Sequence, residues 1–271
     1  EKWRKKYDDL VGKHGEPLHP DFPIYSEGIM VGPTSPITIE QLRTMCVTDI
    51  VTFLASWIPP TNNFMAPSPE GLARVLADIV AEEPQRFAEN AEQFKDLDPT
   101  YVRALFSGFR NSLKRNKTFA WDAVLRLCRW VVNQPREIRG RKAEPLEKDP
   151  HWGWARKAIA DLISEGFTQS DGQIPHAFRQ EVWSILHPLT QDPDPTPECE
   201  QGDDGPSMDP ATLSINTTRG SAIHAVIRYA LWLRQYLQKL PDANERLGRG
   251  FAEMPEVRQV LNEHVDPQNE P

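Results

Sequence analysis

Apolar residues recur at intervals of three and four along most of this chain, and this spacing constrains the fold more than any other feature. After Asp98 the repeat places one set of residues on a single helical face up to about Asn116: Val102, Leu105, Phe106, Phe109 and Leu113. A second helix, capped by Thr118, buries another set and ends before Pro135: Trp121, Val124, Leu125, Cys128, Val131 and Val132. Because the connection is short, the two helices are predicted to form an antiparallel pair.

Helix starts are marked by a capping residue followed by proline. Proline is well tolerated in the first turn, where its missing N–H would have no helical partner. The signal occurs at Ser68-Pro69, Asp98-Pro99, Asp149-Pro150 and Asp209-Pro210. Strand patterns are weak throughout, and residues 23–31 are interpreted as a loop. We therefore predict an all-α fold, with more than half of the residues helical and no sheet of three or more strands.

Further helices are expected on both sides of this first pair. Upstream, shorter helices are predicted at 39–45, 49–57, 71–81 and 86–94. Downstream, a second pair covers 154–163 and 178–186 with a turn at 170–172, and a third covers 223–240 and 255–265. Hairpins at loosely similar spacing are typical of HEAT-type or armadillo-type stacking, although no fixed period is repeated here. The expected architecture is a set of helical hairpins stacked as an irregular α-solenoid.

Composition along the chain indicates two lobes. We expect an N-terminal helical lobe over residues 1–145 and C-terminal helical hairpins over 146–271, with a flexible acidic loop at about 190–210. The stretch 189–211 holds seven acidic residues and five prolines but no lysine or arginine, so it has little to bury. The chain begins at Glu1 rather than Met, and its last helical pattern has no stop signal. We expect a fragment of a longer chain.

The sequence offers little catalytic chemistry. It contains no phosphate-binding glycine motif, no nucleophile elbow and no paired histidines at metal-binding spacing. Cys46, Cys128 and Cys199 are odd in number and far apart, which argues against disulfides and favours a reducing cytoplasm. Cys128 falls on an apolar helix face, as an inert buried thiol does. We predict no enzyme activity, no cofactor, no metal and no membrane span.

Basic residues gather between residues 103 and 142, where eleven Lys or Arg stand against two acidic residues for a formal charge of +9. The whole chain carries −8, which leaves −17 outside this window. Such an island is a candidate surface for nucleic acid or another polyanion. The residues proposed for it are Arg103, Arg110, Lys114, Arg126 and Arg129. The alternative is that these side chains form a solvated face or meet acidic neighbours, including the loop 192–209, in the same molecule.

A second candidate anion site lies at the start of the long helix near residue 218. The segment 216–220 reads Asn-Thr-Thr-Arg-Gly, in which a threonine is expected to cap the helix. Exposed backbone N–H groups at Thr218, assisted by Arg219, could receive an anion. A satisfied helix start without a ligand is the alternative interpretation.

Three segments carry a resemblance to known proteins: 149–156 (DPHWGWAR), 216–222 (NTTRGSA) and 255–258 (PEVR). They resemble helical-repeat, HEAT-like or armadillo-like regions of large bacterial multidomain proteins of the anti-phage defence type. The resemblance implies a binding or scaffolding segment of a larger cytoplasmic protein, acting as a sensor or assembly region. Its expected partners are other domains of the same chain or other proteins. An enzyme of unfamiliar type and a polyanion-binding module are the rival hypotheses.

Overall fold

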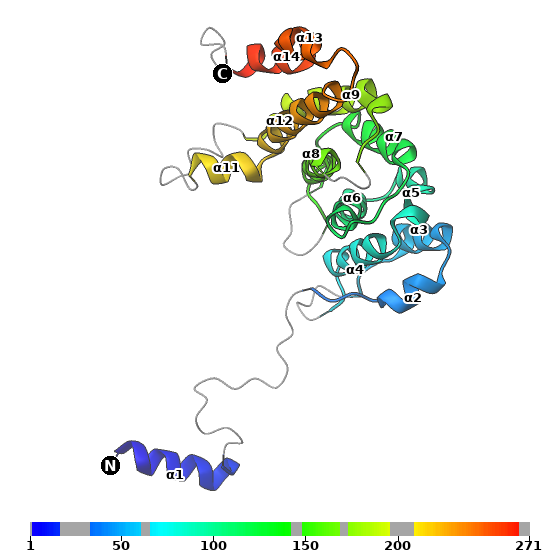
Figure 1. The fold of residues 1–271 in the computed structure, drawn as a ribbon. Coiled ribbons are helices and arrows are strands. Elements are labelled where there is room, and N and C mark those ends of the chain that lie inside the picture. Colours follow the sequence, from blue (N-terminus) through cyan, green and yellow to red (C-terminus); the bar gives the residue numbers. More distant parts are fainter. Residues whose placement is uncertain are drawn as a thin grey trace. The chain divides into compact units, whose positions relative to one another are not determined.

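The computed structural model describes residues 2–16, 33–60, 66–141, 148–168, 173–195 and 209–265. Of these residues 71% are helical, in 13 α-helices and three short 3-10 helices, and none forms a strand, so the all-α prediction is confirmed. Figure 1 shows the elements, which are α1 (Lys2–His14), α2 (Ile39–Thr44), α3 (Val47–Ser56), α4 (Pro69–Glu82), α5 (Pro84–Ala88), η1 (Ala91–Phe94), α6 (Pro99–Lys114), α7 (Trp121–Val132), α8 (Gly153–Thr168), η2 (His176–Phe178), α9 (Arg179–Thr190), α11 (Pro210–Asn216), α12 (Thr218–Leu237), α13 (Ala243–Gly248), η3 (Gly250–Ala252) and α14 (Pro255–His264).

The chain divides into two compact units, residues 1–32 and residues 33–271. In the first unit, α1 buries none of its residues and exposes Trp3, Tyr7 and Leu10. Their spacing of four and three places them on one face of the helix. All other helices belong to the second unit.

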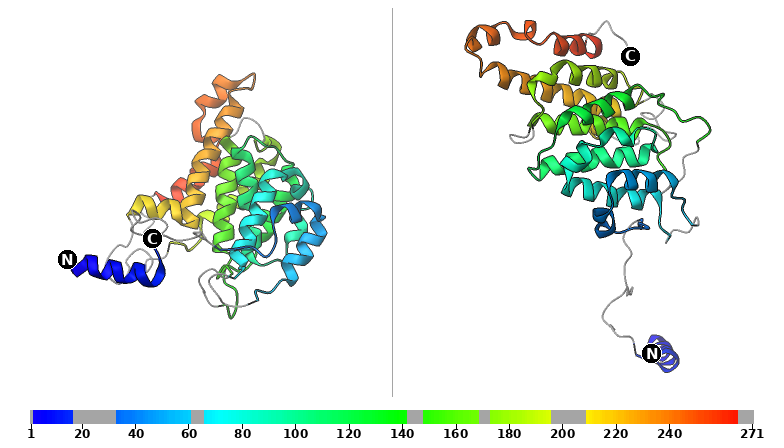
Figure 2. Two further views of the ribbon diagram at one scale, coloured as in Figure 1. Left: turned by 90° about the horizontal axis from the view of Figure 1, so that it is seen from below. Right: turned by 90° about the vertical axis from the view of Figure 1, so that its right-hand side faces the viewer.

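Four helices of the second unit pack side by side in chain order: α4 against α6, α6 against α8, and α8 against α12. A second row is formed by η1, α7 and α9, and α9 also contacts α12 and α14. Figure 2 shows these rows from two directions. From α6 to α9 the chain alternates between the rows. The predicted α6–α7 pair therefore joins two rows, whereas α6 itself packs mainly against α4 and α8.

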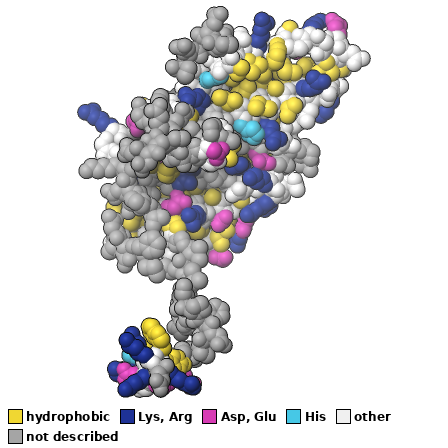
Figure 3. Space-filling model, turned by 90° about the vertical axis from the view of Figure 1, so that its left-hand side faces the viewer, with side chains coloured by type: hydrophobic (Ala, Val, Ile, Leu, Met, Phe, Trp, Pro, Cys, Tyr) yellow, Lys and Arg dark blue, Asp and Glu magenta, His cyan; other side chains and the backbone are white. Residues whose placement is uncertain are grey.

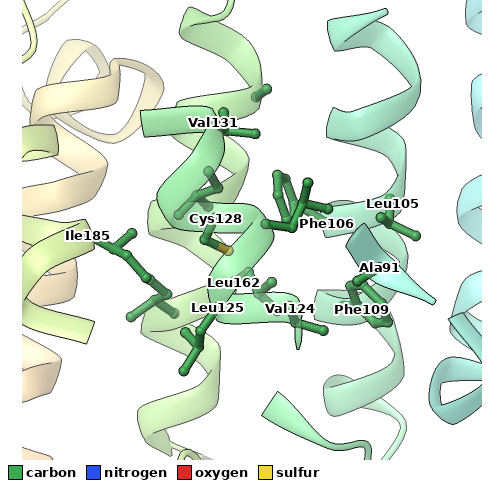
Figure 4. Close-up of a cluster of buried hydrophobic side chains, with 14 of the residues drawn as sticks. Ala91, Leu105, Phe106, Phe109, Val124, Leu125, Cys128, Val131, Leu162 and Ile185 are labelled. Atoms are coloured by element: carbon green, nitrogen blue, oxygen red, sulfur yellow. The ribbon is translucent and has the colours of Figure 1, made fainter. Parts of the chain in front are cut away.

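One hydrophobic core runs through both rows, from Leu42 to Val260. Figure 4 shows part of it, where Cys128 of α7 lies among Phe106, Leu162 and other apolar side chains. Helices α6 and α8, on either side of the predicted lobe boundary at 145, pack against each other. The division into lobes 1–145 and 146–271 stays a prediction.

The predicted helix starts are correct in three cases. Ser68 accepts a hydrogen bond from the Gly71 N–H at 3.1 Å, and Asp98 accepts one from the Thr100 N–H at 3.1 Å. Asp209 accepts one from the Thr212 N–H at 3.0 Å. These carboxylate and hydroxyl oxygens satisfy N–H groups that lack a partner within the helix.

Two other predicted starts are wrong. Helix α7 is preceded by Ala120, which makes no side-chain cap, so Thr118 does not cap it. Helix α8 begins at Gly153, because the Asp149 carboxylate is taken by Arg103 rather than by the N–H groups of a helix. The long-range ion pair thus displaces a local capping pattern.

The α4–α6 crossing depends on the absence of a side chain at Gly108. A Cβ atom at this position would lie 2.6 Å from Val80 Cβ and 2.7 Å from the carbonyl oxygen of Ala77. Both contacts are shorter than van der Waals separation, so only glycine lets the two helices approach this closely. The close approach fixes the spacing at the start of the first row.

Candidate functional site

The five basic residues predicted to bind a polyanion lie in several different environments. Arg103 of α6 donates to both Asp149 oxygens, at 2.8 and 3.0 Å, and to a Glu70 oxygen at 2.6 Å. Its guanidinium also lies over the Trp154 ring, 5.7 Å from the centroid. Asp149 is buried; burial raises its pKa, and the contacts with Arg103 oppose that rise only in part. Arg103 thus joins α4 and α6 to the segment before α8.

Further along α6, Arg110 faces the neighbouring helix α8. It donates to Asp161 at 3.1 Å, and Glu165 lies 4.0 Å from its Nε atom. Lys114, in the last turn of α6, is exposed to solvent. Two of the three basic candidates on α6 therefore serve the packing of the first row.

The two candidates on α7 point to different neighbours. Arg126 pairs with Glu92 of η1 and with Asp122, the latter at 3.2 Å. Arg129 contacts Glu181 of α9 and the Ser184 hydroxyl, each at 3.2 Å. Arg103, Arg110, Arg126 and Arg129 thus meet acidic neighbours, as the alternative interpretation expected. The structure does not gather the five candidates in one groove.

The acidic segment predicted to be flexible begins with an anchored residue. Asp192 is buried, with Arg156 at 3.0 Å and Arg136 at 3.4 Å from its two carboxylate oxygens. Arg156 also donates to the carbonyl oxygens of Val132 and Gln134, at 3.2 and 2.7 Å. The expected flexibility does not fit Asp192, which ties the segment after α9 to α7 and α8. Residues 196–208 of the predicted loop lie outside the described residues.

The predicted anion site at the start of α12 is filled by the chain itself. Thr217 caps the helix, as its hydroxyl accepts from the Gly220 N–H at 3.3 Å. The Thr218 N–H donates to the Asp194 carboxylate at 3.0 Å. Arg219 donates through its backbone N–H to the Asp194 carbonyl oxygen and through its guanidinium to that of Pro195. An Asp194 carboxylate therefore occupies the position proposed for an external anion.

The structure reveals an apolar surface that the sequence reasoning missed. On α12, Ile223, Ile227 and Leu231 are spaced by four residues and therefore lie along one side of the helix. Ile223 is partly buried, whereas Ile227 and Leu231 are 57% and 51% exposed. We call these three residues the α12 stripe. Ile215 of the adjoining α11 is also exposed. Figure 3 shows hydrophobic side chains gathered over this part of the molecule, with basic side chains at their margin.

A signal for the stripe was present in the sequence. Helix α12 carries apolar residues on two sides, because Ala225, Tyr229 and Leu233 are buried while the α12 stripe is turned away from them. A helix that is apolar on opposite sides is expected to be covered on both. Among the described residues, however, no helix covers the stripe as α8 covers the buried side.

The charges on α12 are all of one sign. The helix contains Arg219, His224, Arg228 and Arg234 but no aspartate or glutamate. Within the described part of the chain, no carboxylate lies within ion-pair distance of Arg228 or Arg234. The arginines of α4, α6, α7 and α9, in contrast, all pair with carboxylates: Arg74, Arg103, Arg110, Arg126, Arg129 and Arg179.

The described residues offer little support for a catalytic or metal-binding site elsewhere. In the described ranges, no three His, Cys, Asp or Glu residues gather as metal ligands would. A polar groove of about 670 Å³ between α7 and α9 is lined by Arg129, Asn133 and Glu181, among other residues. Its arginine and glutamate already pair with each other. This groove has no arrangement of nucleophile and base.

The two cysteines among the described residues should differ strongly in the reactivity of their thiols. Cys128 is completely buried in the core, and this burial raises the pKa of its thiol. Cys46 is exposed before α3. Under native conditions we expect a maleimide to modify Cys46 at least about a hundred times faster than Cys128, because only an accessible thiolate reacts. Peptide mass mapping after timed quenching measures both rates, and labelling in urea is the control. Equal native rates would contradict the buried position of Cys128.

No helix in the described ranges is both long and apolar enough to cross a membrane. Comparisons with protein-family models, curated proteins and solved structures found no match to this chain.

Proposed function

We propose that this chain is a protein-binding or scaffolding module that binds its partner through the α12 stripe. The observation that carries the proposal is the exposure of two large aliphatic residues, Ile227 and Leu231, which are 57% and 51% exposed on the outer side of a well-packed helix. Exposed apolar surface of this kind, bordered by polar residues, is characteristic of interaction sites. Burying two such side chains on a partner contributes about 3 kcal/mol to binding.

The position of the stripe supports this role. Helix α12 packs against α8 as the last member of the first row, and the stripe lies on the side turned away from that core. In stacked helical proteins the terminal helices carry a polar outer face, because nothing packs beyond them. An apolar outer face on the last helix of the first row offers a place for one more helix. The alternation of helices between two rows supports the α-solenoid interpretation of the fold.

From the sequence resemblance we propose that the chain is a sensor or assembly segment of a larger bacterial cytoplasmic protein of the anti-phage defence type.

The two rival functions have less support. Polyanion binding would have to break ion pairs made by Arg103, Arg110, Arg126 and Arg129. For an enzyme of unfamiliar type, no cluster of convergent reactive groups among the described residues supplies a starting point.

The proposal predicts that charge on the stripe removes partner binding without unfolding the chain. In the double variant Ile227→Lys, Leu231→Lys, both changes fall on exposed side chains, so we expect the free energy of unfolding to change by less than about 1 kcal/mol. Two buried ammonium groups would prevent an apolar contact from forming. Proteins that co-purify with the tagged wild type from cells that express it naturally should be lost from the double variant.

The control is Ile58→Lys, which alters an isoleucine outside α12 that is more exposed still, at 81%. This variant should keep the wild-type set of co-purifying proteins. Circular dichroism and thermal unfolding verify that all three proteins fold alike. If wild type and double variant retain the same proteins in quantitative mass spectrometry, the α12 stripe is not the binding surface.

A further inference from the structure

We infer that the partner of the α12 stripe is an amphipathic helix whose apolar side is flanked by acidic residues. This inference rests on the proposed function and specifies the chemistry of the partner. It combines two observations, the shape of the apolar stripe and the charge of the helix that presents it.

The shape favours a helix. The α12 stripe repeats every four residues, and such a line of side chains forms a ridge that packs into the groove of another helix. From Ile223 to Leu231 the ridge is about 12 Å long, since a helix rises 1.5 Å per residue. A partner helix of three to four turns covers this length. Helices α4, α6, α8 and α12 already pack side by side, so the partner would extend the row by one member.

The charge favours an acidic partner. Arg228 and Arg234 have no carboxylate within ion-pair distance in the described part of the chain, and α12 itself holds no acidic residue. Among the described residues, Arg219 donates to the carbonyl oxygens of residues 194 and 195, and His224 is exposed. On a chain with formal charge −8, basic residues that stand beside an apolar ridge and have no carboxylate partner among the described residues select carboxylates on the partner.

The same charges argue against a second copy of this chain on the stripe. A symmetric contact between two α12 helices would bring the two sets of arginines together, because a two-fold interface places the same patch on both sides. Like charges at such a contact cost free energy. An anionic membrane offers the right charge, but the exposed part of the stripe holds only aliphatic side chains, Ile227 and Leu231. Interfacial helices typically bury larger apolar faces that include aromatic residues.

Three synthetic helices test the inference on the full chain. Each is about 18 residues long and carries leucines at positions i, i+4 and i+8, and the flanking positions are all Glu, all Lys or all Gln. We expect the Glu peptide to bind with a dissociation constant of about 10–100 μM, as weak contacts of this size do. The Lys peptide should bind at least about tenfold more weakly, and salt should reduce this difference. Fluorescence anisotropy of labelled peptides measures all three affinities.

Variants of the chain complete the test. Arg228→Glu with Arg234→Glu should reverse the preference, so that the Lys peptide binds at least about tenfold more tightly than the Glu peptide. Ile227→Lys with Leu231→Lys should remove binding of every peptide, and Ile58→Lys should change none. Circular dichroism establishes that each variant is folded.

Four outcomes would overturn the inference. Equal binding of the three peptides would show an apolar contact without charge selection and would leave the proposed function intact. In the second outcome no peptide binds, but the Ile227→Lys, Leu231→Lys variant still loses its cellular partners. This result would reject a helical acidic partner but not the binding surface. The third outcome is that the wild type sediments as a dimer and the Ile227→Lys, Leu231→Lys variant as a monomer. The fourth is that the wild type binds phosphatidylserine vesicles but no peptide, and that the same variant loses the vesicle binding. A second copy or a membrane surface would then be the partner.

Discussion

Replacing Asp192 by alanine should destabilise the second unit by about 3 kcal/mol, as removal of one member of a buried ion pair does. The Asp192 side chain is fully buried and takes part in the contacts with Arg156 and Arg136, at 3.0 and 3.4 Å. It also accepts from the Asp194 N–H at 3.1 Å. Without the carboxylate, the largely buried Arg156 guanidinium loses its carboxylate partner, and Arg136 retains the exposed Glu137. Urea unfolding followed by circular dichroism gives the change in free energy.

Asp122→Ala is the matched control. Asp122 pairs with Arg126 at 3.2 Å, but both side chains are about half exposed, and exposed pairs of this type contribute at most about 0.5 kcal/mol. The control should therefore unfold within about 0.5 kcal/mol of the wild type. If Asp192→Ala behaved like Asp122→Ala, the carboxylate would not be holding the segment after α9 on α7 and α8.

Replacing Gly108 by leucine should cost at least about 3 kcal/mol, the upper part of the range for overpacking in a protein core. A single Cβ already lies 2.6 Å from Val80 Cβ and 2.7 Å from the Ala77 carbonyl oxygen. A leucine needs more room than that, so α4 and α6 would have to separate and expose the core between them. The higher helix propensity of leucine recovers less than about 1 kcal/mol of this loss.

Gly248→Leu supplies the comparison, because nothing lies within 4 Å of a Cβ at that position. We expect this variant to match the wild type within about 1 kcal/mol. Thermal unfolding monitored by tryptophan fluorescence compares the two substitutions. Equal midpoints for both leucine variants would show that α4 and α6 do not approach each other closely at Gly108.

Local patterns in the sequence predict the helices well, because caps and apolar periodicity act over a few residues. Ser68 and Asp98 are recognised as caps from their neighbours alone, and both make the predicted hydrogen bond. Asp149-Pro150 has the same local pattern, but its carboxylate is bound by Arg103, 46 residues away in the chain. A local rule cannot include a partner at that distance, so this prediction was wrong.

The candidate site was harder to predict for the same reason. The sequence shows the basic residues between 103 and 142, but not that Glu70 and Asp161 lie beside Arg103 and Arg110. Likewise, Ile223, Ile227 and Leu231 are indistinguishable by composition from buried core residues. Which of the two apolar sides of α12 is covered depends on where α8 packs, and this arrangement is a property of the whole unit.

The order of the first row has a consequence for how the protein is made. Helices α4, α6, α8 and α12 pack in the order in which they are synthesised, and each touches the one made before it. Domains synthesised at about 5–20 residues per second can start to fold while the ribosome still holds their C-terminal part. The interface between α4 and α6 can therefore close before α12 exists, so each new helix of the row presents an exposed edge until the next one packs on it. Among the described residues, the α12 stripe is an edge of this kind that stays exposed.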